Sequence, residues 1–174
     1  ADYPDCLKIV EEKVKLEREQ NNDDGARRFW WRFLRPRPEL YATISGMEQV
    51  FAVPRVSKFL NVDVIPKVIV ASEATVIIAD NRYSVFAICQ CAVHESWTQD
   101  LQSSLETRGR YTPSDCFETF PFPKGLLEKG MVEYPELEDV GERYHAHRCR
   151  IMQEHSQGLT KTYNRFHNPK DLTA

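Results

Sequence analysis

The sequence predicts an α/β (α+β) fold, with a small mixed or antiparallel sheet packed against one long helix and flanked by N- and C-terminal helices. Three observations predict this fold. Apolar residues at helical spacing open the chain, short β-like runs fill its middle, and further helical patterns follow them. The 174 residues, 41% hydrophobic and 28% charged, are enough for one globular core.

The first predicted element is an amphipathic helix over residues 5–20, whose apolar residues recur every three to four positions. The turn-forming sequence Asn-Asn-Asp-Asp-Gly at 21–25 ends this helix. Residues 26–41 follow, with five arginines among aromatic residues and no acidic residue before Glu39. Two prolines near the end of this stretch prevent a helix from continuing through it.

Four β-like runs are predicted next: residues 41–45, 49–58, 62–71 and 74–80. Pro54 and Pro66 lie inside two of them, which places these strands at an edge, at a bulge, or broken in two. Asp80 is the expected N-cap of a helix that runs to about Gln102. A final helix is expected to start near Pro135, since proline suits the first helical turn.

Three parts are expected along the chain: an N-terminal helix at 1–24, an α/β domain at 25–123, and an acidic linker with a C-terminal helical segment at 124–174. The most apolar run, residues 62–79, contains a lysine and a glutamate, so no membrane span is expected. The N-terminal residues lack an export signal, and the five cysteines lack CxxC spacing. We therefore expect a cytoplasmic protein without a membrane partner.

The net charge of −3 is distributed unevenly along the chain. Residues 1–24 carry eight acidic and four basic side chains, and residues 125–142 carry six and one. Basic residues outnumber acidic ones in 25–124, by 12 to 10, and in 143–174, by six to two. Because a phosphate backbone responds to the local field, the net charge does not exclude a nucleic-acid partner.

Catalytic motifs are absent from the sequence, which contains no GxSxG, no HExxH and no glycine-rich phosphate loop. The most suggestive cluster is His145, His147 and Cys149, but residues two apart on a helix point in different directions. The cysteines are expected to be small buried side chains. We therefore predict that this chain is not an enzyme and has no catalytic residue, cofactor site or metal site.

Polar residues on the expected loops offer a mixture of hydrogen-bond donors and acceptors, which direct reading of base edges requires. The candidate DNA-binding residues are Arg55, Ser57, Lys58, Lys67, Ser72, Glu73, Arg82, Arg108 and Arg110. Two alternatives stay open. Arg108 and Arg110 either contact phosphates or pair internally with Asp115 or Glu118, and the aromatic residues among the arginines either bind a polyanion or form a core or interdomain patch.

Three blocks, residues 30–58, 94–123 and 157–169, resemble in the same order the C-terminal part of MmeI-like DNA methyltransferases. The resemblance implies a target-recognition segment of a bacterial restriction-modification or phage-defence enzyme that methylates adenine at N6. Its partners would be double-stranded DNA and the catalytic domain of the same chain, where S-adenosylmethionine would bind. The alternative is an interdomain scaffold or interaction module with little DNA contact.

The resemblance also ranks the candidate residues. It makes Arg55, Ser57 and Lys58 the first DNA contacts to expect, and it makes His94 and Trp97 structural. Residues 110–123, RYTPSDCFETFPFP, are expected to be an internal strap between domains rather than a DNA-reading loop. Sequence specificity is expected in the loops between residues 53 and 82, although the resemblance does not define the DNA sequence that is read.

Overall fold

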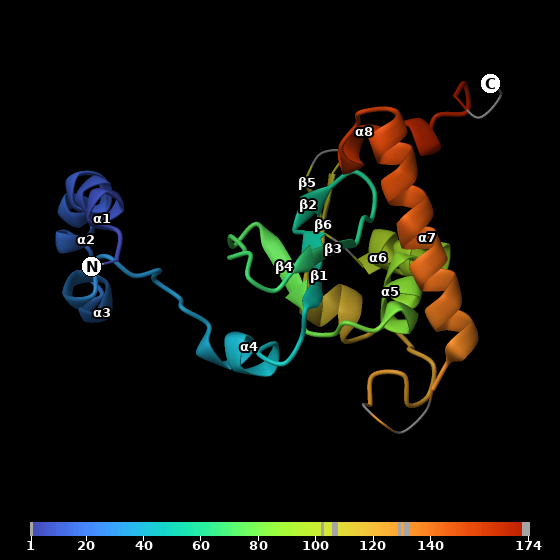
Figure 1. Ribbon diagram of the computed structural model, residues 1–174, viewed down its shortest axis with the longest axis horizontal. Helices are drawn as coiled ribbons and strands as arrows, with labels where there is room; N and C mark the ends of the chain where they lie inside the picture. Colours follow the sequence, from blue (N-terminus) through green and yellow to red (C-terminus); the bar gives the residue numbers. More distant parts are fainter. Residues whose placement is uncertain (1, 102, 106–107, 129, 131–132, 172–174) are drawn as a thin grey trace. The chain divides into compact units, whose positions relative to one another are not determined.

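The computed structural model describes residues 2–101, 103–105, 108–128, 130 and 133–171, with the backbone alone for 103–105 and 108 (Figure 1). The chain divides into two compact units, residues 1–42 and 43–174. The three-part division expected from the sequence stays a prediction. The α+β fold class is confirmed, because the described elements are helices and two small antiparallel sheets.

The first unit is helical. Its helical segments are α1 (Pro4–Val10), the π-helical turn η1 (Glu11–Lys15), α2 (Leu16–Glu19) and α3 (Asp24–Arg28). The first three are consecutive and confirm the helix predicted for residues 5–20. Asp23 caps α3, because its carboxylate accepts a hydrogen bond from the Ala26 amide at 2.8 Å. Ala26 is the one described residue of residues 1–42 that is buried.

Residues 41–45 do not form the predicted strand. The short helix α4 (Pro38–Thr43) covers most of them, and a turn follows it. Pro38 explains the error: a proline prevents an earlier helix from continuing, but its fixed φ angle and missing N–H suit the first turn of a new helix. The alternation of apolar and polar residues over five positions was too short to distinguish the two structures.

Two three-stranded antiparallel sheets organise the second unit. The first has the order β3-β1-β4, formed by β1 (Gln49–Pro54), β3 (Asp63–Pro66) and β4 (Thr75–Ile78). The second has the order β2-β6-β5, formed by β2 (Val56–Ser57), β5 (Ser103–Leu105) and β6 (Arg108–Arg110). The predicted run 49–58 is therefore broken in two after Pro54, as one of the expected alternatives required.

The helix predicted from Asp80 to about Gln102 is two helices, α5 (Tyr83–Gln90) and α6 (Ala92–Leu101). Cys91 separates them with an extended ψ of 157°, and its sulfur lies 3.4 Å from the His94 amide at the start of α6. Asp80 is not the N-cap of α5, a position that Arg82 occupies. The long helix of the fold is instead α7 (Pro135–Glu154), which starts at the predicted Pro135.

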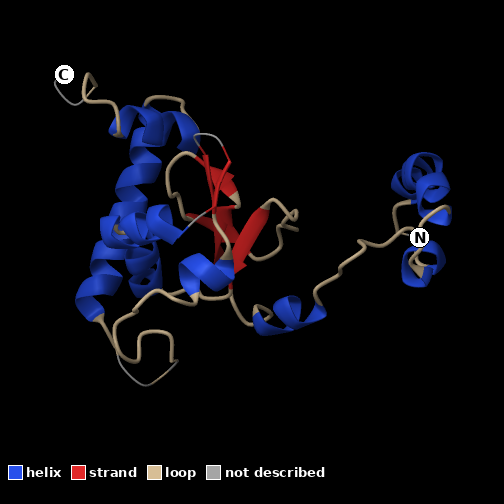
Figure 2. Ribbon diagram, turned by 180° about the vertical axis from the view of Figure 1, so that it is seen from behind, coloured by secondary structure: helices blue, strands red, loops and turns tan. Residues whose placement is uncertain are grey.

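Helices α5, α6 and α7 lie on one side of the strands (Figures 1 and 2). Glu138 of α7 accepts hydrogen bonds from the Tyr83 and Ser84 amides, at 2.8 and 2.7 Å, and so satisfies the first turn of α5. Gly141 permits close contact there, because a Cβ atom at this position would lie 2.1 Å from the Tyr83 carbonyl oxygen. Helix α8 (Leu159–Phe166), which the sequence did not predict, follows α7.

The core of the second unit lies between the β3-β1-β4 sheet and α5. The rings of Phe51 in β1 and Phe86 in α5 are both fully buried, with centroids 5.6 Å apart. Arg148 of α7 is buried beside this core, where it donates to the Val62 carbonyl oxygen at 2.7 Å and pairs with Asp63 at 3.2 Å. In the described part of the chain, no helix is long and apolar enough to cross a membrane.

Candidate nucleic-acid interface

Strands β2 and β6 bring together two groups of candidate residues that are far apart in the sequence. Val56 pairs with Arg110 and Ser57 with Gly109, and the Tyr111 amide donates to the Arg55 carbonyl oxygen at 2.8 Å. The pairing places the Arg55–Lys58 stretch beside Arg110. Arg108 begins β6, but its side chain lies outside the described residues.

The two faces of this strand pair have different environments. Directly paired residues share a face of an antiparallel sheet, so Val56 and Arg110 lie on the same face, and both are exposed. The opposite face carries Ser57, half-buried, and Gly109, buried. We call the half-buried Arg55 together with the exposed Val56, Lys58 and Arg110 the β2–β6 surface. It combines three positive charges with one apolar side chain.

The loop after β2 is held in place by hydrogen bonds from two helices. The side chain of Gln90 in α5 accepts from the Val62 amide at 2.7 Å and donates to the Leu60 carbonyl oxygen at 3.2 Å. Glu95 in α6 accepts from the Leu60 amide at 3.3 Å. These hydrogen bonds hold the backbone of the loop in one conformation. The backbone of Lys58, at the start of the loop, is therefore positioned in the unbound chain.

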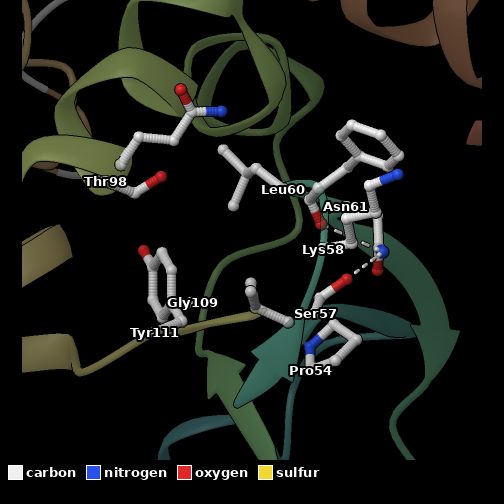
Figure 3. Close-up of a pocket in the computed structure, with 11 residues that line it drawn as sticks. Pro54, Ser57, Lys58, Leu60, Asn61, Thr98, Gly109 and Tyr111 are labelled. Atoms are coloured by element: carbon white, nitrogen blue, oxygen red, sulfur yellow. Dashed lines mark hydrogen bonds between the residues drawn. The ribbon is translucent and has the colours of Figure 1, made fainter. Parts of the chain in front are cut away.

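Ser57 is engaged inside this loop. Its hydroxyl oxygen accepts a hydrogen bond from the buried Asn61 side-chain amide at 3.1 Å, a contact drawn in Figure 3. The amide also lies 3.4 Å from the Phe59 carbonyl oxygen. The structure therefore gives Ser57 a role in shaping the loop.

Lys58 is exposed and lies against an aromatic pair. Its ammonium is 4.9 Å from the centre of the Phe59 ring, and this ring stacks on His167 at 3.9 Å with an interplanar angle of 7°. His167 directly follows α8, so the C-terminal segment contacts the candidate interface through this stacked pair. Phe59 and His167 are not among the residues expected from the sequence, because no local pattern links two residues so far apart.

Arg55 joins the β2–β6 surface to a second candidate loop. Its Nε donates to the Glu73 carbonyl oxygen at 2.5 Å, and its amide donates to the Ala74 carbonyl oxygen at 2.8 Å. Glu73 and Ser72 are both exposed in this turn before β4. The structure thus brings Arg55, Ser72 and Glu73 together, with donors and acceptors side by side.

Lys67 and Arg82 are engaged with their own chain. The Lys67 ammonium donates to the Ser45 carbonyl oxygen at 2.6 Å. The Arg82 guanidinium binds both carboxylate oxygens of Asp80, at 2.6 Å for the shortest contact, and this hydrogen bonding raises the pKa of Arg82. These contacts do not bring either residue to the β2–β6 surface.

A small cavity lies behind the β2–β6 surface and is lined by Ser57, Leu60, Thr98 and Tyr111 among others (Figure 3). Its volume of about 20 Å³ accommodates roughly one water molecule, which is far too little for a nucleobase. The Tyr111 hydroxyl is buried there without a hydrogen-bond partner in the described structure. Burial raises the pKa of Tyr111, so this group stays a neutral hydroxyl.

Residues 110–123 are partly internal to the second unit. Tyr111, Cys116 and Phe120 are buried, and the His94 ring lies between them and α5 with no exposed surface. His94 Nδ1 is 2.7 Å from the Cys89 carbonyl oxygen. These contacts agree with the expected structural role of His94. The exposed residues of the segment are Arg110, Ser114, Asp115, Glu118, Thr119 and Pro121.

No group of three or more potential metal ligands occurs within the part of the chain that the structure describes. His145 and Cys149 do approach one another, at 3.6 Å, because they are one helical turn apart on α7. The His145 ring packs edge-on against Phe86, and burial lowers its pKa. This pair therefore packs against the core of the second unit.

Comparisons with known proteins indicate the family of this chain. A model of the MmeI target recognition domain family matches residues 5–124. Among solved structures, the chain is similar to the Type IIL restriction-modification enzyme MmeI in complex with DNA, with a TM-score of 0.60 and 17% sequence identity. The similarity covers 95% of this chain and 21% of that one. No curated protein matches significantly.

At this level of identity the structural likeness shows a shared fold. The family match is the stronger observation, since it covers more than half of the chain, including both strands of the β2–β6 surface. The chain belongs to the family of MmeI target recognition domains.

Proposed function

We propose that this chain binds duplex DNA through the β2–β6 surface and reads part of its sequence there. The pairing of β2 with β6 is the observation that carries the proposal, since it gathers the half-buried Arg55 with the exposed Lys58 and Arg110. Guanidinium and ammonium groups bind phosphates, and a guanidinium also donates two hydrogen bonds to guanine in the major groove. The neighbouring Ser72 and Glu73 add acceptors, which cytosine and adenine amino groups require.

The wider role of the chain follows from its family. The similar enzyme is much longer and is described as a restriction-modification enzyme in complex with DNA. We infer that this chain positions DNA for an adenine-N6 methyltransferase domain of a bacterial restriction-modification or phage-defence protein. S-adenosylmethionine would bind in that catalytic domain, and this chain would contribute no catalytic residue.

A salt titration of duplex binding tests the proposal. The chain is mixed with a labelled random duplex, and the dissociation constant is measured between about 50 and 200 mM salt. Each phosphate contact made by a cation contributes about −0.9 to the slope of log affinity against log salt, so the three cations of the β2–β6 surface alone predict a slope near −3. Absence of binding at the lowest salt concentration, or affinity that is independent of salt, would contradict DNA binding.

An interdomain scaffold is a second candidate function, and one observation favours it. In the first unit the apolar side chains of Tyr3, Ile9 and Leu16 are exposed by 54% or more. An interface with another domain would cover these apolar side chains. A chain that fails to bind duplex DNA at low salt, yet binds the other domains of its parent protein, would support the scaffold instead.

A further inference from the structure

The first unit contains a strongly basic segment outside the β2–β6 surface. Residues 27–37, the arginine segment, include five arginines and no acidic residue. Arg27 is paired with Asp24 and donates to the Asn21 carbonyl oxygen at 2.6 Å. The described residues offer no carboxylate within ion-pair distance of the others, Arg28, Arg32, Arg35 and Arg37.

Aromatic rings hold two of these arginines in place. The guanidinium groups of Arg28 and Arg32 lie 5.3 and 4.9 Å from the centre of the Phe29 ring. This ring in turn contacts Trp31 edge-on, with centroids 5.9 Å apart. A guanidinium that lies over a ring keeps its N–H groups available at its edge, so both side chains are oriented for a further partner.

The segment is anchored on one side and exposed on the other. Trp30 is half-buried and lies edge-on to Trp31. The centre of its ring is 5.2 Å from the ammonium of Lys15 in η1. Trp31 and Phe33 remain 47% and 72% exposed. The segment therefore presents unpaired positive charges together with exposed aromatic rings.

We propose that the arginine segment is a second DNA contact of this chain, binding backbone phosphates with Arg28, Arg32 and Arg35. The proposal rests on the proposed function, that the chain binds duplex DNA, and it adds a contact supplied by the first unit. Several like charges held close together without counter-charges repel one another, and a partner that neutralises them removes this cost.

A duplex fits this pattern better than an acidic protein surface. Arg32 and Arg35 are three residues apart in a stretch without helix or strand, so their backbones lie at most about 10 Å apart. Duplex DNA carries one negative charge per about 1.7 Å of axis. Arginines this close together can therefore each contact a phosphate without a binding site shaped for them. A protein surface would need a carboxylate placed for each guanidinium.

The test compares two triple variants of the complete chain. Arg28→Ala/Arg32→Ala/Arg35→Ala removes the charges, and Arg28→Lys/Arg32→Lys/Arg35→Lys keeps them. The alanine variant is expected to lower the salt-dependence slope of duplex binding by about two to three, since each lost phosphate contact removes about 0.9. The lysine variant is expected to keep most of that slope. All three arginines are exposed, so neither variant should unfold the chain.

The outcomes separate this proposal from the proposed function. If the unmodified chain binds no duplex, both fail. If it binds, and the alanine variant binds with the same affinity and slope, the arginine segment is not a DNA contact and the proposed function stands. Unchanged DNA binding with weakened binding to the parent's other domains would assign the segment to protein docking and overturn the proposal.

Tryptophan fluorescence gives a second readout. Trp30 and Trp31 are two of the three tryptophans, and Trp97 is the third. In a Trp97→Phe variant, saturating duplex is expected to protect the exposed Trp31 from quenching by acrylamide. Equal quenching with and without bound duplex would show that DNA does not reach this segment and would overturn the proposal.

Discussion

Strands β1 and β2 follow one another with only Arg55 between them, yet they belong to different sheets. The four central residues of β1 are buried between β3 and β4, whereas Val56 of β2 is exposed and pairs with β6. Pro54 ends the first strand because its nitrogen cannot donate to a ladder. One short stretch of chain thus supplies both a core strand and a surface strand.

The difference separates residues that stabilise the fold from residues that are available to contact a partner. Side chains of β1 are surrounded by apolar neighbours, so their substitution changes the free energy of unfolding. The exposed side chains of the β2–β6 surface, Val56, Lys58 and Arg110, have solvent on one side, so their substitution is nearly neutral for folding. The exposed residues of this surface can therefore vary without loss of the fold.

The largest effect is expected for Phe51→Ala in β1. The Phe51 ring is fully buried against Phe86, so its removal should lower the free energy of unfolding by about 3–5 kcal/mol. The matched change in the next strand, Val56→Ala, should cost no more than about 0.5 kcal/mol. Urea unfolding of both variants checks this, and similar losses would show that the two strands do not differ as described.

A smaller loss is expected for Gly141→Ala in α7. The new methyl group would meet the Tyr83 carbonyl oxygen, so α5 and α7 must move apart, at a cost of about 1–3 kcal/mol. Gly46→Ala is the control, because no atom lies within 4 Å of the added group. Thermal unfolding compares the two, and an unchanged midpoint for Gly141→Ala would mean that this helix contact is looser than described.

Stability is expected to fall in mild acid. Burial lowers the pKa of His94 below its ordinary 6.5, although the Cys89 and Cys116 carbonyl oxygens act in the opposite direction, and burial also lowers the pKa of His145. The unfolded chain therefore binds these protons more tightly than the folded chain. The stabilisation is complete above about pH 6.5 and declines as the pH falls from there towards the folded-state values.

Urea midpoints measured from about pH 8 down to about pH 5 check this dependence. His94→Gln should flatten the decline, and His145→Gln should flatten it separately, since the two side chains titrate at different places in the core. A midpoint that stays constant, or rises, as the pH is lowered would contradict the assigned direction for both groups.

The sequence predicted the parts of the fold that depend on local pattern. The first helix, the break after Pro54 and the start of α7 at Pro135 all follow from apolar spacing or proline chemistry. The break at Cys91 was missed because no proline or glycine marks it, and the contacts of Gln90 and Glu95 with the loop after β2 accompany it instead. Such contacts exist only in the folded chain.

The candidate site was predicted as separate residues rather than as a surface. Arg55, Lys58 and Arg110 were named from their types and from a family resemblance, but their proximity depends on pairing between distant strands. Lys67 and Arg82 were named from their types and loop positions alone, and the structure shows them bound to a backbone oxygen and to Asp80. Residue type indicates what a side chain can bind, and only the fold decides whether it is available.

The central claim, that the β2–β6 surface binds DNA, is tested most directly by charge removal at two places on the second unit. Lys58→Ala/Arg110→Ala removes two exposed charges from this surface, and Lys124→Ala/Arg143→Ala removes two exposed charges elsewhere. We expect the first variant to bind a random duplex roughly tenfold more weakly, with a salt-dependence slope reduced by about two, and the second to resemble the unmodified chain. Equal weakening in both variants, or in neither, would contradict the claim.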